Sequence, residues 1–197
     1  GANKGIGFET ARQLGQRGMT VLLGARDSQR GARAVATLCG EGIDARLITL
    51  DVTDAPSIAR GATRIERELG RLDVLVNNAG IILGRPKPSE TQLADVRRVF
   101  EVNVFAAVAV TNAMLPLLRR ASPAARIVMV SSELGGLSNH GDPGWQYAWF
   151  NAIAYPASKA ALNMVTVQYA KELAAAGIKV NAADPGYTAT DLNGNRG

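Results

Sequence analysis

The chain has 197 residues, of which 47% are hydrophobic and 20% are charged, with 21 glycines, a composition typical of a one-domain α/β protein. The formal net charge is +5, but the basic residues are spread over several expected helices with no block and no interleaved aromatics, which argues against a nucleic-acid-binding surface. One cysteine, Cys39, excludes an internal disulfide and suits a reducing cytoplasm, where we expect the protein to act. With His140 as the one histidine, we expect no metal site.

Apolar runs and helical stretches alternate along the chain. We expect strands at 20–26, 45–52, 72–80, 125–132 and 178–186. Helices are expected from the first glycines to about residue 15, then at 28–39, 56–69 and 89–120, and from about residue 155 to a closing glycine at 177. Ser89 and Gln92 form a possible capping box for the fourth of these helices.

Continuous apolar strands joined through helices indicate a Rossmann-like α/β fold with a doubly wound parallel sheet. The sequence shows no linker or repeat, so we expect one domain over residues 1–197. The glycine loop at the start should follow a strand, and the chain stops without a final helix and strand. We therefore interpret the sequence as a segment of a longer native chain that lacks its first, central strand and its C-terminal strand. No apolar run approaches the length of a membrane span and no secretory signal precedes the first motif, so no membrane partner is expected.

The opening stretch GANKGIG places Gly1, Gly5 and Gly7 at the mouth of the first helix. Glycines let a backbone approach a pyrophosphate closely, and the N-terminus of a helix favours its negative charge. Gly-rich turns are common, so this motif by itself is weak.

The end of the first expected strand bears on the choice of nucleotide. A NAD-binding sheet offers a carboxylate there to the ribose hydroxyls, but Ala25 occupies the position and Arg26 follows it. A guanidinium can hold a 2′-phosphate instead, and Lys4 could approach the same group, which favours NADP(H). The alternative for either residue alone is an exposed cation with no ligand.

Two later strand ends carry polar residues on the same edge of the sheet, where open α/β folds bind ligands. Asp51 ends the run LDVTD and could accept a hydrogen bond from an adenine amino group, while the stretch NNAG, residues 77–80, ends the next strand. Each of these turns taken singly could be structural.

The stretch AIAYPASKAAL places Tyr155 four residues before Lys159 at a helix start, where Pro156 is tolerated. The spacing puts the phenol and the ammonium on one helical face. A neighbouring positive charge lowers the pKa of a phenol, so Tyr155 is expected to exchange protons near neutral pH. A surface helix with an ordinary tyrosine and lysine is the alternative for this stretch by itself.

Taken together, seven motifs occur in the order and spacing of one family: GIG, LDVT, NNAG, VNVF, VSSELGG, YPASK and PGYTAT. The chain resembles the short-chain dehydrogenase/reductases from residue 1 to about residue 190. The resemblance implies a hydride transfer between NADP(H) and a carbonyl compound or an alcohol. It also implies a catalytic set in which Tyr155 is the general acid or base, Lys159 lowers its pKa and binds the nicotinamide ribose, Ser132 holds the substrate oxygen, and Asn103 connects Lys159 to bulk solvent through a water. Ser131 is the nearest wrong choice for the serine.

The resemblance further assigns Pro185 and Gly186 to a turn under the nicotinamide, with Thr188 and Thr190 as candidates for its carboxamide and the phosphates. The full set of residues expected to bind the cofactor is Gly1, Asn3, Lys4, Gly5, Ile6, Gly7, Arg26, Asp51, Val52, Asn78, Ala79, Gly80, Tyr155, Lys159, Pro185, Gly186, Thr188 and Thr190.

Ser132 and Tyr155 are 23 residues apart, a longer separation than is usual in the family, and the surplus contains Trp145, Tyr147, Trp149 and Phe150. Such an insertion resembles the carbonyl-reductase branch. The aromatics either line a pocket for an apolar substrate or pack the insertion onto the domain. Tyr147 is a decoy for the catalytic tyrosine, because an asparagine and not a lysine lies four residues on. We expect a monomer that reduces a ketone or aldehyde, or runs the reverse; the alternative is a catalytically silent NADP(H)-binding regulator.

Overall fold

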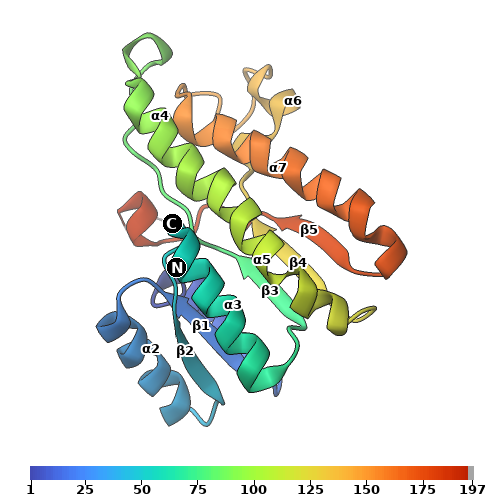
Figure 1. Ribbon diagram of the computed structural model, residues 1–197. Helices are drawn as coiled ribbons and strands as arrows, with labels where there is room; N and C mark the ends of the chain where they lie inside the picture. The colour runs from blue at the N-terminus through green and yellow to red at the C-terminus, as the bar shows by residue number, and fades with distance from the viewer. Residues whose placement is uncertain (195–197) are drawn as a thin grey trace.

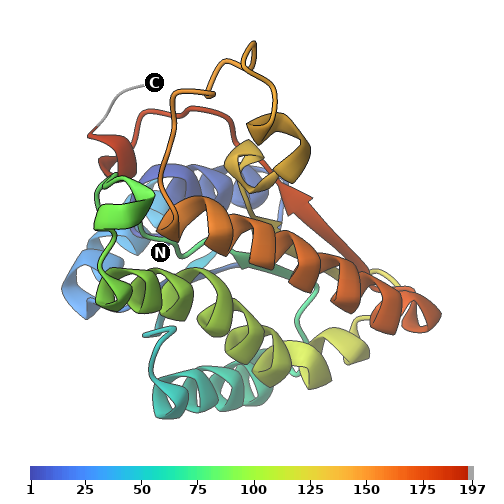
Figure 2. The same ribbon diagram turned by 90° about the horizontal axis from the view of Figure 1, so that it is seen from above.

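The computed structural model describes residues 1–194; residues 195–197, at the end of the expected domain, lie outside that range. Parallel strands form the centre of the fold, and helices cover both faces (Figures 1 and 2). The strands of the described chain are β1 (Val21–Ala25), β2 (Ala45–Thr49), β3 (Val74–Asn77), β4 (Arg126–Val130) and β5 (Lys179–Ala183). Each lies inside an expected strand but ends before the expected strand does. The motif residues predicted at the strand ends therefore lie in the loops that follow.

The sheet is interrupted in the middle. β1 pairs with β2, and β4 pairs with β3 and β5, all in parallel. β1 and β3 are not hydrogen-bonded to each other, and a cavity of about 810 Å³ lies between them, lined by residues of both strands and of α5.

Apart from α6 (Leu137–His140), which the sequence did not predict, the helices agree closely with the predicted ones. They are α1 (Gly5–Gln16), α2 (Ser28–Gly40), α3 (Ala55–Leu69), α4 (Leu93–Phe100), α5 (Ala106–Arg120), α6 (Leu137–His140) and α7 (Ala154–Leu173). Local signals explain several ends: the carboxylates of Asp27 and Asp54 accept hydrogen bonds from the first turns of α2 and α3, and Gly70 ends α3 with a φ of 73°. Gly177, with a φ of 71°, ends the 3-10 turn that follows α7, as expected.

The expected capping box at Ser89 is wrong. Residues 88–90 form a 3-10 turn, α4 begins at Leu93, and its N-cap, Gln92, makes no side-chain hydrogen bond. The helix is also not uniform, because a π-helical turn at Glu101–Phe105 joins α4 to α5. This turn contains Asn103.

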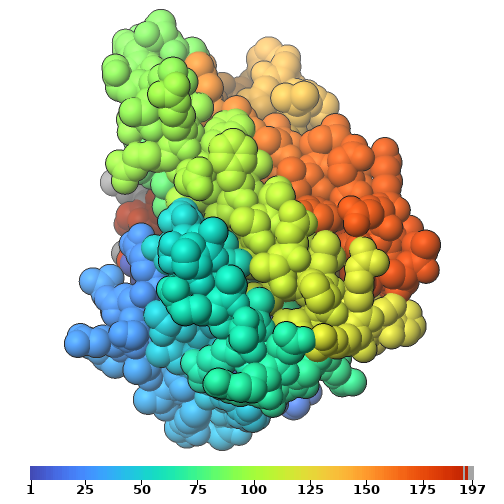
Figure 3. Space-filling view, in the orientation of Figure 1, coloured from blue at the N-terminus to red at the C-terminus, as the bar shows by residue number. Residues whose placement is uncertain are grey.

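The apolar core has two parts, one on each face of the strands. Ile127 and Met129 of β4 pack with α3, α5 and α7, while Leu23 of β1 packs with α1 and α2. In Figure 2 α3, α5 and α7 lie on one face of the strands and α1 and α2 on the other. α4 and α7 pack side by side, and Figure 3 shows α4, α5 and α7 as adjacent ridges on one surface.

The continuous helix Leu93–Arg120 is long and apolar enough to cross a membrane by length and composition, and half of its most apolar stretch is buried within the domain. The expectation that no apolar run approaches this length was therefore wrong for this helix. Its buried residues, such as Val110, Met114 and Leu118, belong to the core around β4, which is the packing of a core helix.

Candidate active site

A cavity of about 670 Å³ at the C-terminal ends of β3, β4 and β5 brings together the three side chains expected to act on the substrate. Ser132 follows β4 by two residues, and Tyr155 and Lys159 lie in the first turns of α7. Pro156 lies in the first turn of α7, where its missing N–H has no helical partner to lose. The helical spacing therefore places phenol and ammonium in one cavity, and the reading of this stretch as an ordinary surface helix does not hold.

Lys159 is buried, with 4% of its surface exposed. Its Nζ donates a hydrogen bond to the carbonyl oxygen of Val130 at 2.7 Å and lies 5.5 Å from the centre of the Tyr155 ring. The ammonium is thus held between the end of β4 and the phenol.

The pKa of Tyr155 is raised from its ordinary value, which corrects the expected lowering. Burial of the phenol is the main cause and the negative charge of Asp184 adds to it, while a hydrogen bond with the Ser132 hydroxyl acts in the opposite direction. Burial also lowers the pKa of Lys159 to about 8, against a smaller rise from Asp184. The helical spacing indicates the attraction between the two groups, but the burial that both undergo comes from the tertiary structure.

The two neighbouring serines are distinguished by their partners. The Ser131 hydroxyl donates to Oδ1 of Asn163 at 2.6 Å and is buried. Ser132 Oγ accepts a longer hydrogen bond, 3.3 Å, from the Leu134 N–H, and it hydrogen-bonds the Tyr155 phenol. The choice of Ser132 over Ser131 agrees with this geometry.

Asn103 lies behind the cavity and does not line it. Its carboxamide is buried, accepting from the Ile81 N–H at 2.8 Å and donating to the Ile81 carbonyl at 3.0 Å. It also donates to the Ser158 hydroxyl, which in turn donates to the Tyr155 carbonyl at 2.7 Å. Asn103 therefore ties the segment after β3 to the first turn of α7.

The expected cofactor residues fall into two groups. Those that line the cavity with the catalytic set are Gly1, Asn3, Lys4, Gly5, Ile6, Asn78, Ala79, Gly80, Tyr155, Lys159, Pro185, Gly186, Thr188 and Thr190. Those that do not line it are Gly7, Arg26, Asp51 and Val52; Gly7 and Val52 line the cavity between β1 and β3 instead.

The glycine loop is closely packed, and its exposed backbone suits the pyrophosphate of a dinucleotide. A Cβ added at Gly7 would lie 2.5 Å from the Gly1 carbonyl oxygen and from Nδ2 of Asn78, which itself donates to that carbonyl at 2.7 Å. Gly5 has a φ of 60°, a conformation that favours glycine. The loop thus brings bare backbone and the N-terminus of α1 to the cavity, the arrangement that accepts a pyrophosphate.

Two expected cofactor contacts are engaged within the protein. The Lys4 ammonium forms an ion pair with the Asp191 carboxylate. Oδ1 of Asp51 accepts hydrogen bonds from the N–H and hydroxyl of Thr53 at 3.0 and 2.7 Å, and these bonds are the first cause of its lowered pKa. The charge of Arg26 lowers that pKa further, so Arg26, directly after β1, lies near Asp51, which follows the neighbouring strand β2.

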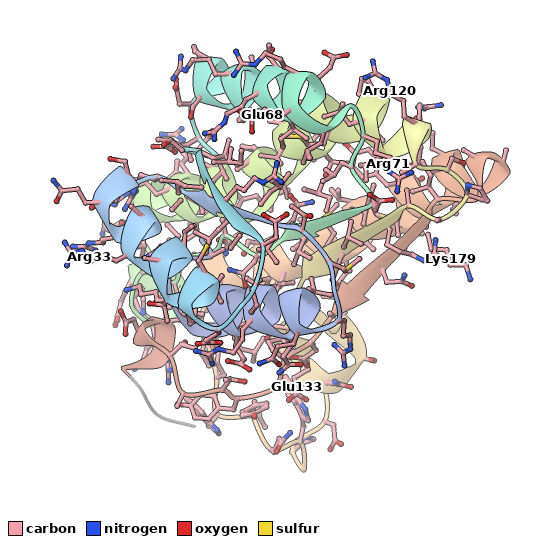
Figure 4. The ribbon with its side chains drawn as sticks, turned by 90° about the horizontal axis from the view of Figure 1, so that it is seen from below. Arg33, Glu68, Arg71, Arg120, Glu133 and Lys179 are labelled. Carbon is pink, nitrogen blue, oxygen red and sulfur yellow. The ribbon has the colours of Figure 1, made fainter. Side chains whose placement is uncertain are left out.

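The aromatic insertion contributes both to the cavity and to its own packing. Tyr147, Trp149 and Phe150 line the cavity, whereas the indole N–H of Trp145 donates to the Glu133 carboxylate at 3.3 Å. Glu133 lies beside the insertion, on the opposite side of the molecule from Glu68 (Figure 4). Tyr147, Trp149 and Phe150 therefore line the pocket, whereas Trp145 packs the insertion onto the domain. The labelled basic side chains in Figure 4 are dispersed around the periphery.

Two further residues at the site, Asn163 and Asp184, escaped the sequence analysis. Asn163 accepts from Ser131 and donates to the Gly135 carbonyl at 3.3 Å, which ties the turn after Ser132 to α7. Asp184 accepts hydrogen bonds from the N–H groups of Glu133 and Gly186 at 3.0 and 2.9 Å. The helical spacing of Asn163 from Lys159 was a usable signal; the position of Asp184 depends on tertiary structure. Among residues 1–194 no group of three or more potential ligands is placed to hold a metal ion.

A family model described as short chain dehydrogenase matches residues 1–197, the whole chain. The chain belongs to this family. A short-chain dehydrogenase of Penicillium roqueforti, anuI, is 37% identical over 203 residues, covering 100% of this chain and 80% of the relative. Human retinol dehydrogenase 13 is 33% identical over 202 residues, covering 100% of this chain and 60% of the relative. The crystal structure of NADPH-bound carbonyl reductase from chicken fatty liver has a TM-score of 0.86 at 29% identity, covering 100% of this chain and 81% of that one.

The resemblance read from the seven motifs is thus confirmed at the level of the family, and the doubly wound α/β fold with it. The chain spans 60% of the length of the human relative.

Proposed function

We propose that the protein is an NADP(H)-dependent oxidoreductase that reduces a ketone or aldehyde to an alcohol, or runs the reverse, with Ser132, Tyr155 and Lys159 as its catalytic residues. The observation that carries the proposal is their convergence in one cavity with the glycine loop and the segment 184–190. Oxidoreductase chemistry is what the family performs, and the carbonyl-reductase type is supported by the aromatic insertion and by the likeness to a solved carbonyl reductase.

The chain's own residues supply binding and proton transfer, while a bound nicotinamide nucleotide supplies or accepts the hydride. Tyr155 gives its phenolic proton to the carbonyl oxygen during reduction and takes it back in the reverse direction. The raised pKa of Tyr155 keeps the phenol protonated, which suits the role of acid, and the hydrogen bond from Ser132 steadies the oxygen that exchanges the proton.

Lys159 holds its ammonium beside the phenol and would favour the phenolate left after proton transfer. Its pKa of about 8 means that the charge is present at neutral pH and is lost as the pH rises through that value. Asn103 and Ser158 act indirectly, by fixing the first turn of α7 that carries both groups.

The preference for NADP(H) is part of the proposal. Ala25 ends β1 without a carboxylate to repel a phosphate, and the exposed Arg26 follows it. Because Lys4 is paired with Asp191, Arg26 is the residue expected to decide between NADPH and NADH. The solved relative with bound NADPH supports this choice.

The test is NADPH oxidation by the purified full-length protein across a panel of ketones and aldehydes, with NADPH affinity measured separately by titration. We expect turnover, and we expect Tyr155→Phe to lower kcat by about 10²–10⁴-fold while NADPH affinity stays the same, because only the proton donor is removed. If NADPH bound normally and neither carbonyl compounds nor alcohols were turned over, the protein would be the silent nucleotide-binding regulator instead.

A further inference from the structure

Arg85, in the loop after β3, lies over two aromatic rings of the insertion. Its guanidinium carbon is 5.4 Å from the ring centre of Trp149 and 5.1 Å from that of Phe150. The preceding residue, Gly84, has a φ of 64°, which sets the turn that leads into Arg85. All three side chains line the cavity that contains Tyr155.

The other cations of this cavity are engaged. Lys4 is paired with Asp191, and Lys159 donates to the Val130 carbonyl. For Arg85, by contrast, residues 1–194 provide no carboxylate within ion-pair distance and no acceptor for a guanidinium hydrogen bond.

The two nearby acids have partners of their own. Glu133 accepts from the Trp145 indole and, at 3.2 Å, from the Gln146 amide. Asp184 accepts from the backbone N–H groups of Glu133 and Gly186. Asp191, the third acid of the cavity, is paired with Lys4. Within residues 1–194 the cavity thus carries one guanidinium whose donors are uncommitted, while each of its three acids has a partner.

Stacking on aromatic rings restricts a guanidinium before any ligand arrives and leaves its N–H donors at the edge of the group. That edge matches a carboxylate, which can accept two parallel hydrogen bonds. The apolar faces of Trp149 and Phe150 at the same place suit a hydrocarbon chain or ring next to the charge.

We propose that Arg85, Trp149 and Phe150 form a subsite for the carboxylate of the substrate, and that the preferred substrates are oxo acids: ketones or aldehydes that carry a carboxylate on an apolar ring or chain. The inference rests on the proposed function, since it places the reacting carbonyl at Tyr155 and the carboxylate at Arg85. It goes further in naming the charge of the substrate and the residue that selects it.

The experiment compares each oxo acid of a series with its primary amide, which has nearly the same shape and no charge. The series varies the number of carbons between carbonyl and carboxylate. We expect kcat/KM to favour the acid by about 10- to 100-fold at the best spacing, mainly through KM, because charge-assisted hydrogen bonds to the carboxylate are lost in the amide. Arg85→Gln should bring the ratio close to one, and Arg85→Lys should retain part of it.

Lys87→Gln is the matched control, because it removes a cation two residues along the same loop that does not line the cavity. The preference for the acid should survive in this variant. If Lys87→Gln lowered the ratio as much as Arg85→Gln, the effect would be one of general charge and the subsite would be wrong.

A binding measurement separates this inference from the proposed function. Benzoate and benzamide are titrated against the NADPH-loaded protein by calorimetry, in the wild type and in Arg85→Gln. Tighter binding of benzoate that disappears in Arg85→Gln supports the subsite even if no carbonyl compound is reduced, a result that would sink only the proposed function. Equal affinity for the two ligands, or equal kcat/KM for acids and amides, would overturn the subsite and leave the reductase standing.

Discussion

Replacing Lys159 with methionine should make the protein more stable near pH 7, because the lysine is charged and buried. The lowering of its pKa from 10.5 to about 8 corresponds to an unfavourable contribution of about 3 kcal/mol to the folded state when the ammonium is protonated. Methionine keeps a similar length without the charge. It loses the hydrogen bond to the Val130 carbonyl, which costs about 1 kcal/mol. The net gain in unfolding free energy at pH 7 is then about 2 kcal/mol.

The dependence on pH is the sharper part of this prediction. Below pH 8 the lysine is protonated in both the folded and the unfolded state, so the advantage of Lys159→Met is constant. Between about pH 8 and 10.5 the unfolded wild type still binds the proton and the folded wild type does not, so the wild type gains stability as the pH rises. The advantage of the variant should therefore shrink through this range and disappear near pH 10.

Urea denaturation of both proteins at a series of pH values from 7 to about 10 measures this difference directly. All other titrating groups are common to the two proteins, so their contributions cancel in the comparison. Lys171→Met, which removes an exposed lysine from the same helix, is the control, and its difference from the wild type should not follow the same curve. Parallel stability curves for the wild type and Lys159→Met would show that the ammonium is not held in a desolvating environment, and the reasoning would fail.

Further changes test the supports of the site. Gly135→Ala should destabilise the protein by about 1–3 kcal/mol in urea, because the added Cβ would lie 2.6 Å from the backbone carbon of Lys159. Asn163→Leu should lower kcat by about 10- to 100-fold with unchanged NADPH affinity, since it releases the turn that carries Ser132; equal losses in both would indicate general damage. Arg26→Ala should reduce the NADPH preference in kcat/KM by about tenfold or more and leave NADH values alone, and no preference in the wild type would end the NADP assignment. Light scattering should give the mass of a monomer at all concentrations, and a concentration-independent dimer would contradict this.

Local patterns were sufficient for much of the fold. The alternation of apolar runs and helices predicted the strands to within a few residues, and Asp54 and Gly70 mark the ends of α3 as capping rules require. The grouping of Ser132, Tyr155 and Lys159 also followed from spacing and family motifs, because parallel strands end on a common edge.

Properties that depend on tertiary environment could not be obtained in this way. The sign of the Tyr155 pKa shift is set by burial from several elements at once, so the proximity of Lys159 on one helix was a misleading guide. The Ser89 capping box failed because the chain makes a separate 3-10 turn before α4. The partners of Arg85 come from an insertion more than sixty residues later in the sequence, a contact that no local pattern encodes.

The π-helical turn at 101–105 also determines how the long helix tolerates changes in length. A π turn holds one more residue than an α turn, so the five residues of this turn rotate the chain through nearly the same angle as four residues of an α-helix. Deleting one residue there should therefore give a regular helix that keeps Val99, now fully buried, in the core and α4 packed on α7. Deleting one residue within α5 would instead rotate α4 by about 100° relative to the part of α5 that packs on α3 and β3, and Val99 would leave the core. The irregular turn is thus the part of the long helix in which the loss of one residue should disturb the packing least.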